Sequence, residues 1–126
     1  MATTDRLQHQ SPDLAEIIKA LPVAERAALV QHAVEKVAAM VGVADECRSA
    51  SDLDGLVTHL DEEAWSLQAA NVPTTEYVRA FKRARAANAW LFAASDHSLA
   101  GSCDAIYEAV HALAGQSEQI SAMLGR

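Results

Sequence analysis

The stretch Tyr77–Ala94, YVRAFKRARAANAWLFAA, decides the fold of this chain. It contains neither glycine nor proline, and seven of its residues are alanine, the strongest helix former. Pro73 ends the preceding segment, the two threonines after it offer an N-cap, and Glu76 places an anion in the first turn. The sequence therefore predicts a helix over residues 75–94.

The two halves of this helix differ in the pattern of their side chains. The first half is amphipathic, because Arg79, Lys82 and Arg83 lie opposite the apolar stripe. The second half is apolar on nearly every side, and a helix of that kind is buried on every side. We therefore expect the second half to lie in the centre of a bundle or in an interface between subunits. The apolar stripe contains Tyr77, Phe81, Ala84, Leu91 and Phe92.

The flanking sequence predicts further helices on both sides of this stretch. Apolar residues recur at helical spacing within about 11–20, 22–41, 51–71, 99–113 and 117–124. Residues 1–10 are polar and predict a flexible N-terminal tail, whereas 43–50 is either a loop or one or two turns of helix. We predict an all-α fold: a single domain over 11–126, built as a bundle of five or six helices with helix 75–94 central.

Composition and charge limit the function classes. Hydrophobic residues make up 51% of the chain but aromatic residues only 5%, as in a helical bundle rich in Ala, Leu and Val. The net charge of −7 argues against nonspecific nucleic-acid binding, which needs a cationic surface. No apolar run approaches the roughly 20 residues that cross a bilayer. We expect a soluble, cytoplasmic protein with no nucleic-acid or membrane partner.

The spacings typical of metal and catalytic sites are weak in this chain. Glu108 and His111, like His59 and Glu63, have the spacing of metal ligands, but both pairs fall on the predicted polar faces of their helices. Nucleophile and phosphate-loop motifs are absent from the sequence. Cys103 lies on an apolar stripe, and Cys47 lies among acidic residues that disfavour a thiolate. We therefore expect no metal, cofactor or catalytic residue.

Arg85 and Asn88 lie near the inner side of helix 75–94, where polar side chains need partners. A buried amide left unpaired costs about 1–3 kcal/mol. Tyr107, at the edge of the next apolar stripe, is one candidate partner. We favour a structural polar network over a ligand site, but a pocket lined by Arg85, Asn88 and Tyr107 stays an alternative.

Trp65 and Trp90 both lie off the main apolar stripe of their helices. Interfaces are enriched in Trp, Tyr and Arg, so both tryptophans are candidate interface residues, with Arg79 and Arg83 beside Trp90. The alternative for the tryptophans is a second buried layer. The alternative for the cations is ion pairing within the chain to the acidic cluster of residues 61–63.

These observations support one main functional hypothesis and two alternatives. The main one is a non-enzymatic helical interaction protein that forms a homodimer through the Trp90 side of helix 75–94. The first alternative is an acidic inhibitor or immunity-type protein that masks a basic partner through residues 61–63. The second is a small enzyme or ligand binder with a pocket around Arg85, Asn88 and Tyr107.

Overall fold

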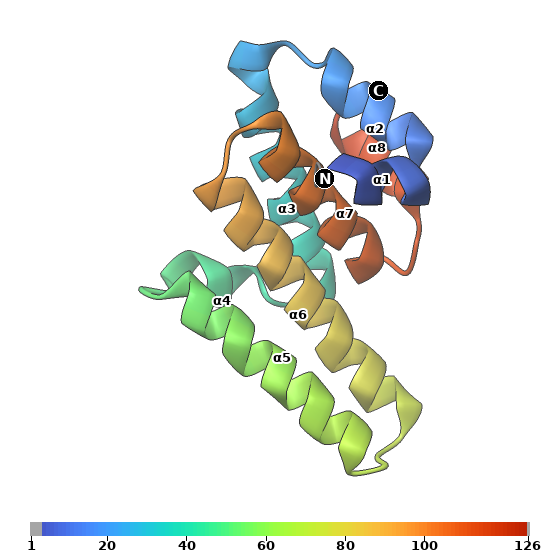
Figure 1. The fold of residues 1–126 in the computed structure, drawn as a ribbon. Coiled ribbons are helices and arrows are strands. Elements are labelled where there is room, and N and C mark those ends of the chain that lie inside the picture. Colours follow the sequence, from blue (N-terminus) through green and yellow to red (C-terminus); the bar gives the residue numbers. More distant parts are fainter. Residues whose placement is uncertain (1–3, 126) are drawn as a thin grey trace.

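A computed structural model of the chain describes residues 4–125, which form helices and connecting segments without a strand. The all-α fold is confirmed, and the elements follow one another as Figure 1 shows. They are α1 (Thr4–Gln10), α2 (Pro12–Ala20), α3 (Val23–Val41), α4 (Ala44–Ser49), α5 (Leu53–Ala69), α6 (Thr74–Ser95), α7 (Leu99–Ala112) and α8 (Ser117–Met123).

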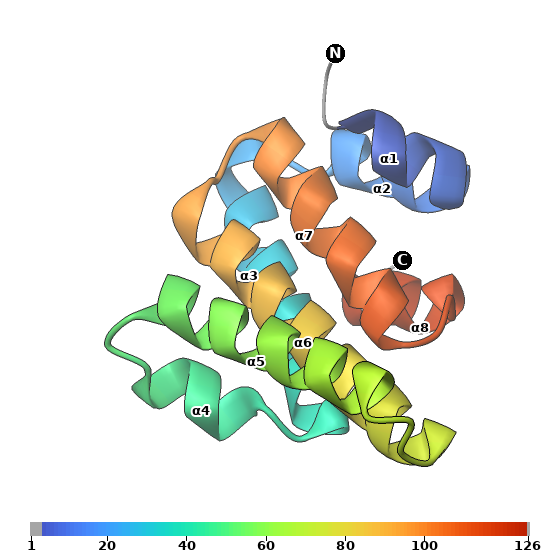
Figure 2. The ribbon, with the colours of Figure 1, turned by 60° about the horizontal axis from the view of Figure 1, so that its bottom comes forward.

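The helices α5 and α6 form a hairpin that protrudes from the rest of the molecule (Figure 1). α6 packs mainly against α7, α5 and α3, and α1 packs on α7. Helices α1, α2 and α8 gather around α7 at one end of the molecule, while the turn between α5 and α6 lies at the opposite end (Figures 1 and 2). The core cluster of buried side chains extends along this hairpin only as far as Leu60 and Ala84. The far part of the hairpin therefore lies outside the main core.

Small side chains occupy many of the buried positions of α6 and α7. Ala86, Ala87 and Ala89 of α6 are fully buried, and so are Ala105 and Ala109 of α7. The separation of packed helices depends on the side chains between them, so alanine allows a close approach. The apolar half of α6 is thus shielded within a single chain, by α7 and by its other neighbours.

Short local signals fix the helix ends. Gly42 ends α3 in the left-handed region, with φ of 83°, where glycine carries no steric penalty. Ser98 caps α7 by accepting a hydrogen bond from the Gly101 amide at 3.1 Å. A Cβ at Gly101 would lie 2.2 Å from the backbone oxygen of Asp96, so only glycine fits this turn.

Two short helices correct the sequence prediction. Residues 4–10 form helix α1 with Leu7 fully buried, so the predicted flexible tail is wrong for that part; residues 1–3 lie outside the described residues. Residues 44–49 form helix α4, which resolves the ambiguous segment. The described chain therefore has eight helices rather than five or six. None of these helices combines the length and apolarity that crossing a membrane requires.

We expect Ala87→Leu to destabilise the fold by about 1–3 kcal/mol, because the extra methyl and methylene groups would overpack the buried side of α6. Ala94→Leu is the matched control, since Ala94 is exposed in the last turn of the same helix, and it should change stability by less than about 0.5 kcal/mol. Urea unfolding of the three proteins measures the difference. Equal effects at the two positions would contradict the close packing of α6.

Candidate functional site

A cluster of five charged side chains joins α1, α5, α6 and α7. Arg85 of α6 donates to Glu108 Oε1 of α7 at 2.7 Å and also pairs with Asp61 of α5. Arg6 of α1 donates to Asp104 Oδ1 of α7 at 2.9 Å, and its other terminal nitrogen lies 3.8 Å from Glu108 Oε2. Three carboxylates therefore share two guanidinium groups, which leaves the cluster with one excess negative charge.

The two carboxylates of α7 are buried, which makes their pairing necessary. Glu108 is 3% exposed and Asp104 is 5% exposed. A buried carboxylate without a partner is strongly destabilising, so the arginines are part of the fold. Burial by itself would lower the pKa of the Arg85 guanidinium, but Glu108 and then Asp61 raise this pKa above its ordinary value. Arg85 is therefore held as a cation between two helices.

Glu108 corrects the sequence analysis, which placed it on a solvated face with His111. The α1 helix covers this face of α7. Glu108 lies away from the apolar stripe of α7, but α1 buries it in the folded chain. Tyr107 contacts Arg6, whose guanidinium carbon lies 4.3 Å from the ring centroid, and His111, whose ring centroid lies 4.7 Å away. α1 thus closes over the charged cluster.

The pocket predicted around Arg85, Asn88 and Tyr107 is not the cavity that the structure forms at Arg85. The observed cavity lies on the α5 side and has a volume of about 260 Å³. Neither Asn88, which is half-buried, nor Tyr107 lines it. Arg85 already forms ion pairs with two carboxylates, so its charge is not directed at an open ligand site. The lining residues are Asp61, Ala64, Trp65, Tyr77, Phe81 and Arg85.

Trp65 lies beside this cavity and is the most exposed Trp, Tyr or Phe side chain of the chain. It is 70% exposed, whereas Tyr77 and Phe81 next to it are half-buried, with ring centroids 6.2 Å from each other. Arg85 lies against Phe81, with its guanidinium carbon 5.7 Å from the ring centroid. A projecting tryptophan and a hollow of side-chain size thus adjoin on one surface, which we call the Trp65 face.

Trp90, in contrast, belongs to the interior of the chain. It is 7% exposed, and Arg48 of α4 lies over its ring with the guanidinium carbon 5.7 Å from the centroid. The prediction of an interface on the Trp90 side rested on the position of Trp90 off the apolar stripe, with a second buried layer as the alternative. The α4 helix, formed by residues 44–49, lies over this side. Trp90 is therefore a buried side chain and is not available to a second subunit.

The cations beside Trp90 in the sequence have separate environments in the fold. Arg83 pairs with Glu46 of α4 and lies 3.8 Å from Glu63 of α5, so its charge is satisfied within the chain. Among the described residues, neither Arg79 nor Lys82 lies within ion-pair distance of a carboxylate. The predicted pairing of the basic run with residues 61–63 thus holds for Arg83 alone.

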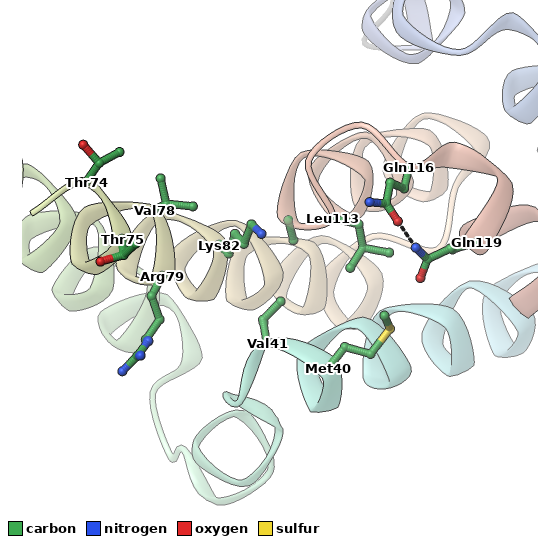
Figure 3. A pocket seen from close by; sticks show the side chains of 11 residues that line it. Met40, Val41, Thr74, Thr75, Val78, Arg79, Lys82, Leu113, Gln116 and Gln119 are labelled. Atoms are coloured by element: carbon green, nitrogen blue, oxygen red, sulfur yellow. Dashed lines mark hydrogen bonds between the residues drawn. The ribbon is translucent and has the colours of Figure 1, made fainter.

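A larger groove, lined by other residues of α6, has a volume of about 620 Å³ (Figure 3). Its walls come from the end of α3, residues 74–82 of α6, and the junction of α7 with α8. The apolar lining residues are Met40, Val41, Val78, Ala112 and Leu113, and the polar ones are Thr74, Thr75, Arg79, Lys82, Gln116 and Gln119. No carboxylate belongs to this lining.

Few features of the described residues support a metal site or a reactive thiol. No three histidine, cysteine or carboxylate side chains are grouped there as ligands of one ion. Burial raises the pKa of the Cys47 thiol to about 11, with Glu46 acting in the same direction and Arg83 and Arg48 opposing it. Burial also raises the pKa of Cys103. Both thiols are buried and stay protonated at neutral pH.

Sequence reasoning missed several residues that matter here. Arg6 was assigned to the tail, and Asp104 was not singled out, although Asp104 and Glu108 lie one helical turn apart and form an acidic pair on α7. Met40 and Val78 were not noticed either, because each is a single apolar residue on a polar helix side. Only the fold brings them into one groove.

The sequence matches no protein-family model, and comparisons with curated proteins and with solved structures likewise give no match.

We expect Arg85→Met to lower the free energy of unfolding by about 3–5 kcal/mol, because it leaves the buried Glu108 with only the more distant Arg6. Arg79→Met is the matched control: Arg79 is exposed and unpaired, so the loss should stay below about 0.5 kcal/mol. The double variant Arg85→Met/Glu108→Gln should recover part of the loss, because it removes the unpaired charge. Urea unfolding at neutral pH measures all three.

The buried Cys47 thiol should make stability fall at high pH. Its pKa in the folded protein is about 11, above the ordinary value of 9.0, so folding favours the protonated thiol. This contribution is complete below pH 9 and is lost as the pH rises toward 11. We expect the pH dependence of unfolding over that range to be shallower in Cys47→Ala. Identical profiles in the two proteins would contradict the burial of this thiol.

Proposed function

We propose that this chain is a non-enzymatic interaction protein that pairs with a second copy of itself through the Trp65 face. The observation that carries the proposal is the exposure of Trp65, at 70%, beside a cavity of about 260 Å³. A large exposed aromatic side chain is costly to leave in water, and tryptophan is enriched among the residues that dominate binding energy.

The geometry of this face favours self-association over binding of a different protein. In a two-fold dimer the same surface of both subunits meets, so a projecting group must fit a hollow on its own surface. The Trp65 face has both, since Trp65 adjoins the cavity lined by Tyr77 and Phe81. Asp61 and Arg85 on the same face carry opposite charges, so two such faces do not repel each other. In this proposal α6 is the central helix, because it carries the aromatic wall and anchors it to the core.

The alternatives have less support. The inhibitor-type alternative uses the acidic residues 61–63 as its contact, yet Asp61 pairs with Arg85 and Glu63 lies 3.8 Å from Arg83. Only Glu62 of the three has no such partner among the described residues. The enzyme or ligand-binder alternative needs Arg85 to face a substrate, and its guanidinium is already held by two carboxylates.

Light scattering after size-exclusion chromatography tests this function. We expect the unmodified protein to be dimeric and Trp65→Ala to be monomeric, with the same helical circular-dichroism spectrum. Val23→Ala is the control, because Val23 is an equally exposed apolar residue at the start of α3, and this variant should stay dimeric. A protein that is monomeric at about 0.5 mM would rule out self-association of useful strength.

A further inference from the structure

The groove between α3, α6 and the α7–α8 junction combines exposed apolar side chains with cations that have no ion-pair partner among the described residues. Met40, on its α3 wall, is 54% exposed, and Val78 on its α6 wall is also exposed. Two exposed large apolar side chains that line one groove, beside further apolar residues of its walls, form an apolar patch of the kind that contacts a partner. Methionine adapts its shape to different neighbours, which suits a surface that binds another chain.

The two charged residues that line the groove, Arg79 and Lys82, are both cations. Lys36 lies one helical turn before Met40 on α3. None of the three is within ion-pair distance of a carboxylate among the described residues. Five of the nine described lysine and arginine side chains pair with a carboxylate, and these three are among the four that do not. The groove therefore offers apolar contact with unpaired positive charge at its edge.

The α6 wall has the shape that a helix packs against. Thr74, Val78 and Lys82 are spaced four residues apart, so they form one ridge along α6, and helices pack by fitting such ridges into grooves. Figure 3 shows Val78 and Lys82 projecting from α6, with Leu113, Gln116 and Gln119 beyond them and Met40 on the α3 side. An incoming helix would lie between these walls.

We propose that this groove binds an acidic amphipathic helix of a partner protein, with its apolar side against Met40, Val78 and Leu113 and its carboxylates toward Lys82. This binding mode is the helix-in-groove form of recognition. Charge complementarity selects the partner, because the groove has cations at its edge and no carboxylate in its lining. It is also a different surface from the Trp65 face, so neither proposal depends on the other.

A designed peptide tests the groove directly. The probe is a fluorescein-labelled helix of about 18 residues with leucine at helical spacing and glutamate on its polar side. Its binding is followed by fluorescence anisotropy, and a matched peptide with lysine in place of glutamate is the control. We expect the glutamate peptide to bind and the lysine peptide to bind at least about tenfold more weakly.

Two charge reversals separate the groove from the overall charge of the protein. Lys82→Glu should weaken binding of the glutamate peptide by about tenfold or more. Lys19→Glu makes the same charge change on α2, away from the groove, and should have little effect. A third variant, Met40→Ala, removes apolar contact without changing charge and should also weaken binding. Circular dichroism of each variant shows whether it folds.

Four outcomes would overturn the proposal. The first is no binding of the glutamate peptide at about 1 mM, and the second is an equal effect of Lys82→Glu and Lys19→Glu. The third is loss of the dimer in Lys82→Glu, which would make a second copy the occupant of the groove. The fourth is binding of dodecanoate in place of the peptide with the same dependence on Lys82, which would make a small anionic amphiphile the ligand. Loss of the dimer in Trp65→Ala with peptide binding unchanged would support both proposals.

Discussion

The close approach of α6 and α7 is the constraint on which the other features of this structure depend. These two helices form the most extensive helix contact in the described chain and both bury several alanines, so there is little room for larger groups and little freedom for the helices to shift. Because α7 is buried on nearly every side, two of its carboxylates, Asp104 and Glu108, are buried as well. The fold then needs cations at those points, and α6 supplies Arg85 while α1 supplies Arg6.

The charged cluster therefore has a structural role more than a chemical one. Each carboxylate has a guanidinium partner, and the arginines also lie over Phe81 and Tyr107. Such an arrangement fixes how α1, α5 and α7 sit around α6. Two of its members, Asp61 and Arg85, also line the cavity of the Trp65 face, so the cluster borders that surface.

Local sequence predicted the helices well but could not predict what covers them. Helix 75–94 is observed as Thr74–Ser95, since its alanines, Pro73 and the capping residues act over a few positions. Glu108 was placed wrongly, and Trp90 was left between an interface and a buried layer, for one reason. A short helix covers each residue: α1 covers Glu108 and α4 covers Trp90. The sequences of these two helices are too polar to predict that they pack against the rest of the chain. The groove was missed because Met40, Val78 and Leu113 are far apart in the chain and meet only in the fold.

The far part of the α5–α6 hairpin lies beyond the core cluster, and its buried side chains there are the small Ala64 and Ala80. Few apolar contacts hold this region, so it can open locally while the rest of the molecule stays folded. Its backbone amides would then exchange with solvent sooner than those of α7. Both proposed surfaces border this region, so a bound partner would suppress the opening and draw part of its affinity from ordering the hairpin.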